Sequence, residues 1–416
     1  MNATLFFYRT VTDTILQDDL FANVSSYAIL MMEKRKKEKV FFMTSCIVIG
    51  GGILGASTAY HLAKEGAAVT LIDRGDKGQA TDAAAGIVCP WVSQRRNKLW
   101  YRLAKGGARF YPALIEELKS CGETETGYAR VGAICLHIEE EKLQKIEERA
   151  LQRREDAPEM GEITRLSPKE TKALFPPLAE EYSSIHVSGA ARVNGRALRD
   201  SLIRAAQKLG ATYIRGSAKL IHHGAQVIGV EVEGRQYVGD AVIATAGAWS
   251  KELLLPLGIE FLVTPQRAQI VHLERPERDT DNWPVIMPPN NQYLLAFNDG
   301  RIVVGATHED GVGFDCRITA GGLHEVLDKA LTVAPGLANC TYLETRVGFR
   351  PYTPGFLPVF GTLPGFKGIY VANGLGASGL TAGPYLGSEL AKLVLGKPTE
   401  LDPSDYNVAG AIKHSE

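Results

Sequence analysis

The stretch CIVIGGGILGASTAYHLAKEGAAVTLID, residues 46–73, decides how this chain folds. It opens on a short β-branched apolar run, residues 46–50, which is typical of a strand buried on both faces of a parallel sheet. Residues 53–64 then repeat apolar side chains every three or four positions, which predicts a helix that ends near Gly66. A second apolar run, AVTLID, predicts another strand that ends at an acidic residue, Asp73.

The glycines of this unit match a dinucleotide-binding fingerprint in its required context. Gly50, Gly52 and Gly55 satisfy the GxGxxG pattern, and Asp73 follows Gly50 by 23 residues. Gly50 permits a tight turn, Gly52 lets backbone N–H groups approach a pyrophosphate, and Gly55 lets the helix pack closely on the strand. The carboxylate of Asp73 would accept hydrogen bonds from an adenosine ribose and repel a 2′-phosphate, so NADP is disfavoured.

The residues before this unit allow a second interpretation. A basic run, EKRKKEK at residues 33–39, precedes the apolar stretch, and this order is typical of a secretion signal or a membrane anchor. Three consecutive glycines and several hydroxyl side chains interrupt the apolar stretch, however, which argues against a lipid-spanning helix. Residues 1–42 are therefore interpreted as a leader or a misassigned start outside the fold, with Met43 directly before the first strand.

Length and composition restrict the class of protein. The chain has 416 residues, enough for two domains, and its formal charge of −1 creates no overall field toward nucleic acid or an anionic membrane. Its six cysteines show no CxxC spacing and are interpreted as reduced thiols. These features favour a cytoplasmic protein with a small-molecule partner and no nucleic acid. Peripheral association with a membrane and a homo-oligomer remain compatible with them.

The middle of the chain offers a second place for a cofactor. A loop rich in glycine and alanine, residues 74–91, has small side chains that would let the backbone approach a flat ring. An apolar strand that ends at Gly247 could also present backbone to a cofactor. Beyond Leu254 the chain becomes rich in β patterns, with a hairpin predicted at Asn298-Asp299-Gly300.

Periodicity predicts the remaining elements. The final one repeats the order of strand (residues 368–374), glycine-rich turn (375–383) and helix (384–396), and its turn could lie against a developing anion. The others are helices at 94–120, 140–156 and 195–208 and a strand at 129–139.

One cluster could suggest a metal. His308, Glu309 and Asp310 are all metal-ligating types, but neighbours on an extended chain point in different directions. A polar loop is therefore the better interpretation, and no metal site is predicted.

Three blocks of the sequence resemble one family. They are the glycine fingerprint, IATAGAWS at residues 243–250, and a final block that begins with GFRPYTPGFLPVFG at residue 348 and continues with GIYVANGLGASGLTAGPYLG at residue 368. Together they resemble the FAD-dependent D-amino-acid oxidase superfamily, near glycine oxidase and the small subunit of D-amino-acid dehydrogenase. The resemblance extends over about residues 44–400.

The resemblance implies an α/β fold, α+β overall, with two domains. A Rossmann-like FAD-binding domain would be assembled from residues 43–125, 191–257 and 339–416. A substrate domain with a large antiparallel sheet would comprise residues 126–190 and 258–338.

The resemblance also implies the site residues. Arg350 matches an arginine that clamps the substrate carboxylate, for which a planar guanidinium is well suited, and Tyr293 matches an active-site tyrosine. With the fingerprint and the strand end at Gly247, the residues expected to hold non-covalent FAD are Gly50, Gly52, Ile53, Leu54, Gly55, Asp73, Arg74, Ala80, Thr81, Ala85, Gly86, Ile87, Lys219, Gly247, Leu375, Gly376, Ala377, Ser378, Gly379, Leu380 and Thr381.

The activity implied is oxidation of the CH–N bond of a small amino acid, of the D-amino acid, glycine or N-methyl glycine type. A hydride would pass to flavin N5, the imine would hydrolyse to an oxo acid, and oxygen or a quinone would accept the electrons. Two alternatives stay open: an FAD-dependent 2-hydroxy-acid or glycerol-phosphate dehydrogenase, and a membrane-tethered binding protein.

Three departures from the family pattern leave the substrate open. Gly348 stands near the position where sarcosine oxidases carry the cysteine that tethers the flavin, which argues against a covalent link. Arg346 replaces a tryptophan seen in glycine oxidase, and GLGASG at residues 374–379 lacks a histidine that many relatives carry.

Overall fold

The computed structural model describes residues 43–413. The predicted leader, residues 1–42, lies outside the described residues. Between residues 43 and 413, no helix combines the length and the apolar character that crossing a membrane requires.

A six-stranded sheet forms around the fingerprint. Its order is β18-β19-β12-β1-β2-β8, and all neighbours are parallel except β18 and β19. Strands far apart in the sequence therefore place their carboxyl ends along one edge, where parallel sheets bind ligands. The strands are β1 (Ser45–Ile49), β2 (Ala68–Asp73), β8 (Thr212–Arg215), β12 (Ala241–Ala244), β18 (Val359–Thr362) and β19 (Ile369–Asn373).

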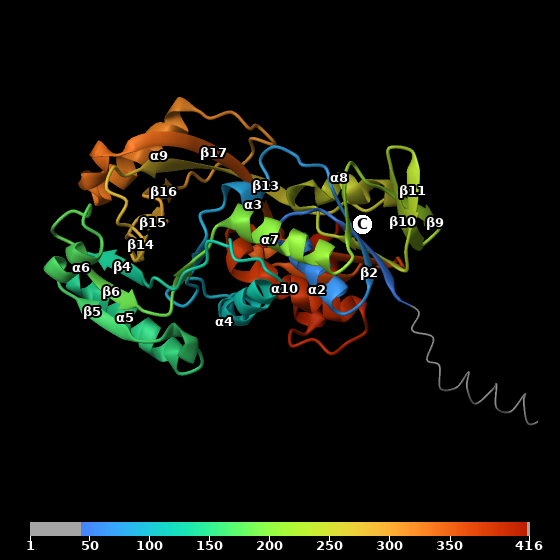
Figure 1. The fold of residues 1–416 in the computed structure, drawn as a ribbon, viewed down its shortest axis with the longest axis horizontal. Helices are drawn as coiled ribbons and strands as arrows, with labels where there is room; N and C mark the ends of the chain where they lie inside the picture. Colours follow the sequence, from blue (N-terminus) through green and yellow to red (C-terminus); the bar gives the residue numbers. More distant parts are fainter. Residues whose placement is uncertain (1–42, 414–416) are drawn as a thin grey trace, which may run out of the picture. The chain divides into compact units, whose positions relative to one another are not determined.

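Helices pack closely beside this sheet. Figure 1 shows α2 (Ile53–Lys64), α4 (Lys98–Ser120) and α10 (Gly379–Val394) next to one another, and α10 contacts both of the others. Small residues permit the approach: a Cβ at Gly387 would lie 2.7 Å from the Cβ of Ser57, and a Cβ at Gly107 would collide with the carbonyl oxygen of Thr381. The fourth helix, α7 (Gly195–Lys208), packs on α2.

Helix α10 begins earlier than the sequence predicts. The glycine-rich segment was expected to be a turn up to Gly383, yet α10 starts at Gly379 and continues through Pro384. Proline removes the N–H that would bond to the carbonyl four residues earlier. Here that carbonyl, Leu380 O, accepts a hydrogen bond of 2.5 Å from the hydroxyl of Tyr111 on α4, which replaces the missing donor.

The second large sheet of the protein has eight strands. Its order is β17-β13-β16-β15-β14-β4-β6-β5, and the neighbours are antiparallel except β14 and β4, which are parallel, so the predicted antiparallel sheet is mixed at one pair. The strands are β4 (Ala133–His137), β5 (Ile163–Leu166), β6 (Ser183–Val187), β13 (Thr264–Glu274), β14 (Val285–Met287), β15 (Tyr293–Ala296), β16 (Arg301–Gly305) and β17 (Thr341–Tyr352).

Strand β17 carries Arg350. It falls inside the 339–416 segment expected in the FAD-binding domain, yet it pairs with β13 along almost its whole length in the eight-stranded sheet. The predicted hairpin at Asn298-Asp299-Gly300 joins β15 and β16, and Gly300 has the positive φ of 79° that such a turn needs.

The outer elements cover the remaining apolar faces. Helices α5 (Glu140–Arg154) and α6 (Pro168–Leu174) pack on the β5–β6 end of the large sheet, and α9 (Ala320–Val333) packs on β13 and β16. A small sheet of β9 (Lys219–His223), β10 (Gln226–Val232) and β11 (Arg235–Val238) lies next to β12. The pattern did not predict α9, which Thr319 caps by accepting a hydrogen bond from the backbone N–H of Gly322.

Candidate active site

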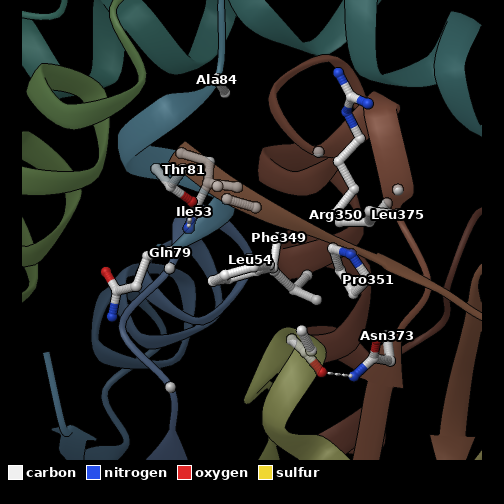
Figure 2. Close-up of a pocket in the computed structure, with 18 of the residues that line it drawn as sticks. Ile53, Leu54, Gln79, Thr81, Ala84, Phe349, Arg350, Pro351, Asn373 and Leu375 are labelled. Carbon is white, nitrogen blue, oxygen red and sulfur yellow. Dashed lines mark hydrogen bonds between the residues drawn. The ribbon is translucent and has the colours of Figure 1, made fainter. Parts of the chain in front are cut away.

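One cavity of about 910 Å³ extends from the carboxyl edge of the six-stranded sheet to one face of the large sheet. Every residue predicted to hold the cofactor lines this cavity except Gly55, and so do both predicted catalytic residues, Arg350 and Tyr293. Figure 2 shows Ile53 and Thr81 on one side of the cavity, with Arg350 and Leu375 on the other.

The fingerprint turn forms the centre of the cavity wall. Gly50 has a φ of 105°, and a Cβ there would lie 2.5 Å from the carbonyl oxygen of Thr245. Gly55 does not line the cavity because it packs against Gly50, where a Cβ would collide with the carbonyl of that residue. Helix α2 has no side-chain cap at Gly52 and no acid in its first turn, so its positive end can accept a pyrophosphate.

Polar groups gather at the end of the cavity beside β2. The carboxylate of Asp73 accepts hydrogen bonds from the backbone N–H groups of Gly51 and Gly75, at 2.5 and 2.6 Å, which fixes its orientation. The guanidinium of Arg74 lies between Asp76 and Glu252, with N–O distances of 2.9 and 2.8 Å. We call this the acidic end, because Asp73, Asp76 and Glu252 are the only acids that line the described cavity.

The segment 375–381 forms another wall, and contacts from distant residues hold it. Trp100 donates from its ring nitrogen to the hydroxyl of Ser378 at 2.9 Å, and Thr381 donates to the carbonyl of Ile87 at 2.8 Å. Helix α10 begins here without a side-chain cap or an acid in its first turn, so its backbone N–H groups can face an electron-rich ring edge. The N-termini of α2 and α10, which have no side-chain cap and no acid in the first turn, fit a flavin dinucleotide together with the glycine turn.

Strand β17 also lines the cavity, and at Gly348 it has no side chain. A Cβ at Gly348 would lie 2.6 Å from the Cβ of Ala83, which is closer than two such carbons pack. Gly348 therefore leaves room for the short helix α3 (Ala80–Ala83) rather than for the cofactor alone.

Strand pairing brings Arg350 and Tyr293 together. Register places Gln266 opposite Arg350, and places Gly305 opposite both Ile270 and Tyr293, so these rows share one face of the large sheet. Nη1 of Arg350 donates to Oε1 of Gln266 at 3.0 Å and to the carbonyl of Thr307 at 3.3 Å. Arg350 is thus oriented by neutral acceptors, and among the described residues no carboxylate pairs with it.

Two titratable groups beside Arg350 stay uncharged near neutral pH. Burial raises the pKa of Tyr293, and the positive charge of Arg350 only partly opposes this effect. Burial lowers the pKa of His308, and Arg350 lowers it further. We call this region the basic end of the cavity.

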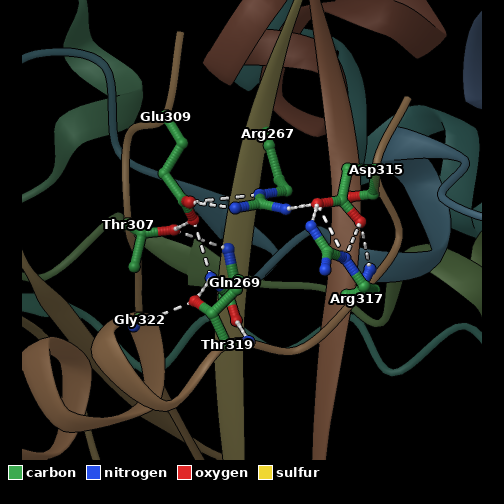
Figure 3. Close-up of polar contacts among 8 residues, drawn as sticks. All are labelled: Arg267, Gln269, Thr307, Glu309, Asp315, Arg317, Thr319 and Gly322. Carbon is green, nitrogen blue, oxygen red and sulfur yellow. Dashed lines mark hydrogen bonds and ion pairs between the residues drawn. The ribbon is translucent and has the colours of Figure 1, made fainter. Parts of the chain in front are cut away.

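A polar network behind Arg350 fixes the carbonyl that holds it (Figure 3). Arg267 forms ion pairs with Glu309 and, at 2.8 Å, with Asp315. Glu309 accepts hydrogen bonds of 2.7 Å from both Gln269 and the hydroxyl of Thr307. Glu309 is therefore occupied by protein groups, and its role here is to position Thr307.

The neighbouring acid is occupied in the same way. Asp310 accepts from Nε2 of Gln266 at 2.9 Å, and the Oε1 of that amide faces Arg350. The sequence interpretation of His308, Glu309 and Asp310 as a polar loop agrees with these contacts.

Several residues that line the cavity were not predicted from the sequence. Two of them lie outside every motif identified in the sequence, Arg95 and Trp100, and three lie inside the blocks that carry the family resemblance without having been singled out, Trp249, Phe349 and Asn373.

The fingerprint and the uncapped first turns of α2 and α10 around one cavity define a dinucleotide-binding protein. A family model described as FAD dependent oxidoreductase matches residues 45–393, so the chain belongs to this D-amino-acid oxidase family. The family is described by its dependence on FAD, and FAD is the cofactor of this chain. The family and the fold class predicted from the sequence are confirmed.

Three related proteins show how close the relationship is. An uncharacterised oxidoreductase of Bacillus subtilis, YurR, is 65% identical over 89% of this chain and 100% of its own length. Glycine oxidase of Pseudomonas aeruginosa is 30% identical over 88% of this chain and 99% of its own. The crystal structure of iminodiacetate oxidase from Chelativorans sp. BNC1 is 48% identical, covers 87% of this chain and 98% of its own, and superposes with a TM-score of 0.85.

Proposed function

We propose that this enzyme oxidises the CH–N bond of a small amino acid and produces an imine that hydrolyses to an oxo acid. The observation that carries the proposal is Arg350, a cation with only neutral partners at the basic end of the cavity, opposite Tyr293. A carboxylate is the complementary group for such a guanidinium. Two relatives are named for the amine-bearing acids glycine and iminodiacetate, which supports an amino-acid substrate.

The residues of the chain would bind and orient the substrate. Arg350 holds the α-carboxylate in a fixed plane, so binding energy is used for alignment of the C–H bond. Tyr293 keeps its proton and can donate a hydrogen bond to the same carboxylate. Bound FAD supplies the acceptor for the two electrons that leave with the α-hydrogen as hydride.

Proton transfer needs no strong base in this arrangement. No carboxylate lines the basic end of the described cavity, and His308 stays neutral because its pKa is lowered. The amine would therefore enter uncharged, and its lone pair would assist the departure of the hydride. The imine then takes up water, which yields an oxo acid and an amine or ammonia.

The individual residue roles and the division into two domains form part of this proposal. Asp73, Arg74 and Lys219 would contact the adenosine portion of FAD, and the segment 375–381 would border the flavin ring. The terminal electron acceptor is oxygen or a quinone.

A substrate panel tests the proposal. Purified protein with a flavin absorbance at about 450 nm is mixed with glycine, N-methylglycine, proline, D-alanine, a set of 2-hydroxy acids and glycerol phosphate. Oxidation of an amino acid, detected as flavin bleaching without oxygen, supports the proposal. Bleaching by hydroxy acids or glycerol phosphate alone would replace it with the dehydrogenase alternative. Hydrogen peroxide release during turnover identifies oxygen as the acceptor.

A further inference from the structure

A third arginine, Arg95, lines the cavity together with Arg74 and Arg350, and the reaction described above does not use it. Arg95 is half-buried in the segment that leads from β3 (Ile87–Val88) into α4, and it lines the cavity. Its guanidinium lies 4.9 Å from the centre of the Trp100 ring. Trp100 is itself buried and donates to Ser378 in the wall of the cavity, so Arg95 rests on a fixed platform.

No acid neutralises Arg95 within residues 43–413. Three arginines line the cavity. Arg74 forms ion pairs at the acidic end, but no ion pair among the described residues includes Arg95. The three acids that line the cavity belong to the acidic end, and Arg74 already pairs with Asp76 and Glu252. A ligand with one carboxylate would therefore satisfy Arg350 and leave the charge of Arg95 without an acidic partner in the same described cavity.

We propose that Arg95 binds a second carboxylate of the substrate, so that the preferred substrate is an amine carrying two carboxylates. This inference rests on the proposed amino-acid oxidation and specifies its substrate class. Arg350 would hold the carboxylate next to the carbon that is oxidised, and Arg95 would hold the carboxylate on the other side of the nitrogen. Ser93 and Asn291, which also line the cavity, are neutral and add no competing charge.

Binding of substrate analogues that cannot be oxidised tests the inference separately from turnover. Thiodiacetate has two carboxylates around a sulfur, whereas methylthioacetate has the same sulfur and one carboxylate. Each is titrated into the FAD-loaded protein, and the shift in the visible flavin spectrum gives the dissociation constant. We expect the wild type to bind thiodiacetate roughly tenfold or more tightly than methylthioacetate, because a charge-assisted hydrogen bond contributes at least that factor.

Variants identify the residue responsible. Arg95→Gln should abolish the preference for thiodiacetate and leave the affinity for methylthioacetate within about twofold, while Arg95→Lys should retain part of it. Arg96→Gln is the matched control, because Arg96 is exposed and does not line the cavity. An unchanged flavin spectrum without ligand shows that each variant is folded.

The outcomes separate this inference from the proposed function. Equal affinity of the wild type for both analogues, or an Arg95→Gln variant that keeps the preference, would overturn the role of Arg95 even if amino acids are oxidised. Turnover of iminodiacetate well above that of its monoamide, lost in Arg95→Gln, would support both. If no amine is oxidised, the proposed function is wrong, and the binding titration still decides whether Arg95 recognises a second carboxylate.

Discussion

At the scale of single residues, Arg350 shows how the chain keeps a cation available for a ligand. Its two acceptors are an amide oxygen of Gln266 and the carbonyl of Thr307, which orient the guanidinium without neutralising it. The two acids that follow Thr307 in the sequence are engaged by other groups: Glu309 by Arg267, and Asp310 by Gln266. The charge of Arg350 is thus available to the proposed substrate carboxylate.

Replacement of Arg350 should impair substrate binding and spare the cofactor. Because a bidentate carboxylate pair would be lost, we expect Arg350→Ala to lower kcat/KM roughly 100-fold, mainly through a higher KM. Steady-state kinetics on the substrate found by the panel measures this. Arg301→Gln, a change on β16 outside the cavity, is the control. Loss of the flavin spectrum in Arg350→Ala would show that the residue serves the cofactor instead.

A second residue, His272, should make stability depend on pH. It is only 4% exposed, and burial, followed by the positive charge of Arg346, lowers its pKa to about 3. The unfolded chain has a histidine pKa of about 6.5, so the unfolded state binds the proton first as the pH falls. The stability is therefore complete above about pH 6.5 and decreases toward pH 3, by about 2 kcal/mol at pH 5.

The variant His272→Phe should remove this part of the pH dependence. Neither ring nitrogen of His272 has a hydrogen-bond partner among the described residues, so phenylalanine loses no polar contact. We expect a similar free energy of unfolding to the wild type at pH 7.5 and a higher one at pH 5, measured by urea denaturation. His61, also buried, contributes equally to both proteins. Parallel pH profiles for the two proteins would contradict the assignment.

The sequence predicted residues that act through local geometry and missed those that act through tertiary contacts. The fingerprint glycines and Asp73 could be predicted because their spacing along one strand–turn–helix unit fixes their positions. Arg95 and Trp100 were not, because only the packing of α4 beside α10 brings them to the cavity.

At the scale of elements, the contact between α4 and α10 connects the helix core to the cavity wall. Gly107 on α4 faces the backbone of Thr381 and Ala382, at the start of α10. We expect Gly107→Ala to displace the beginning of α10, to lower the free energy of unfolding by about 1–3 kcal/mol and to weaken FAD binding. Thermal unfolding and equilibrium dialysis of FAD measure the two effects.

A helical glycine elsewhere provides the control. Gly321 in the first turn of α9 has open space where a Cβ would be. Gly321→Ala should therefore leave FAD binding unchanged and raise stability by about 0.5–1 kcal/mol, because alanine favours a helix more than glycine. Equal losses in the two variants would mean that close packing at Gly107 is not the cause.

Elements with clear periodicity were predicted well, and departures have physical reasons. The pattern located α2 and α7 correctly at both ends, whereas the predicted helix at 94–120 begins at Lys98, after the capping side chain of Asn97. The glycine-rich text predicted a turn where α10 begins, and the sequence does not show that Tyr111 supplies the hydrogen bond missing at Pro384. Helix α9 was missed within β-rich surroundings.

At the scale of the whole molecule, the cavity is assembled from segments separated by hundreds of residues. The turn after β1, the end of β12 and the start of α10 all line it. FAD that binds this folded cavity but not the unfolded chain should stabilise the protein by about 2.7 kcal/mol at 100 times its Kd. The thermal midpoint of the protein with and without added FAD measures this stabilisation.

A fragment of the cofactor shows which parts of the cavity contribute. FMN has the flavin ring but lacks the adenosine that Asp73 and Lys219 are proposed to contact. At equal concentration it should therefore raise the thermal midpoint much less than FAD. Equal stabilisation by both would contradict the placement of adenosine at the acidic end.

The arrangement of both sheets could be expected only through the family resemblance. Periodicity identifies strands, but it does not state that β17 pairs with β13 or that β14 and β4 run in parallel. Such pairings depend on contacts between residues far apart in the chain, which no local window of sequence contains.

The close approach of Gly348 to Ala83 has a bearing on how relatives with a covalently attached flavin could arise. A cysteine introduced at position 348 would bring a Cβ to 2.6 Å from the Ala83 methyl group, so a protein with this single change would carry a steric clash before it gained any bond. Either the loss of the methyl group at position 83 or a shift of α3 would have to open the space, so the single change to cysteine would need a compensating change in the structure.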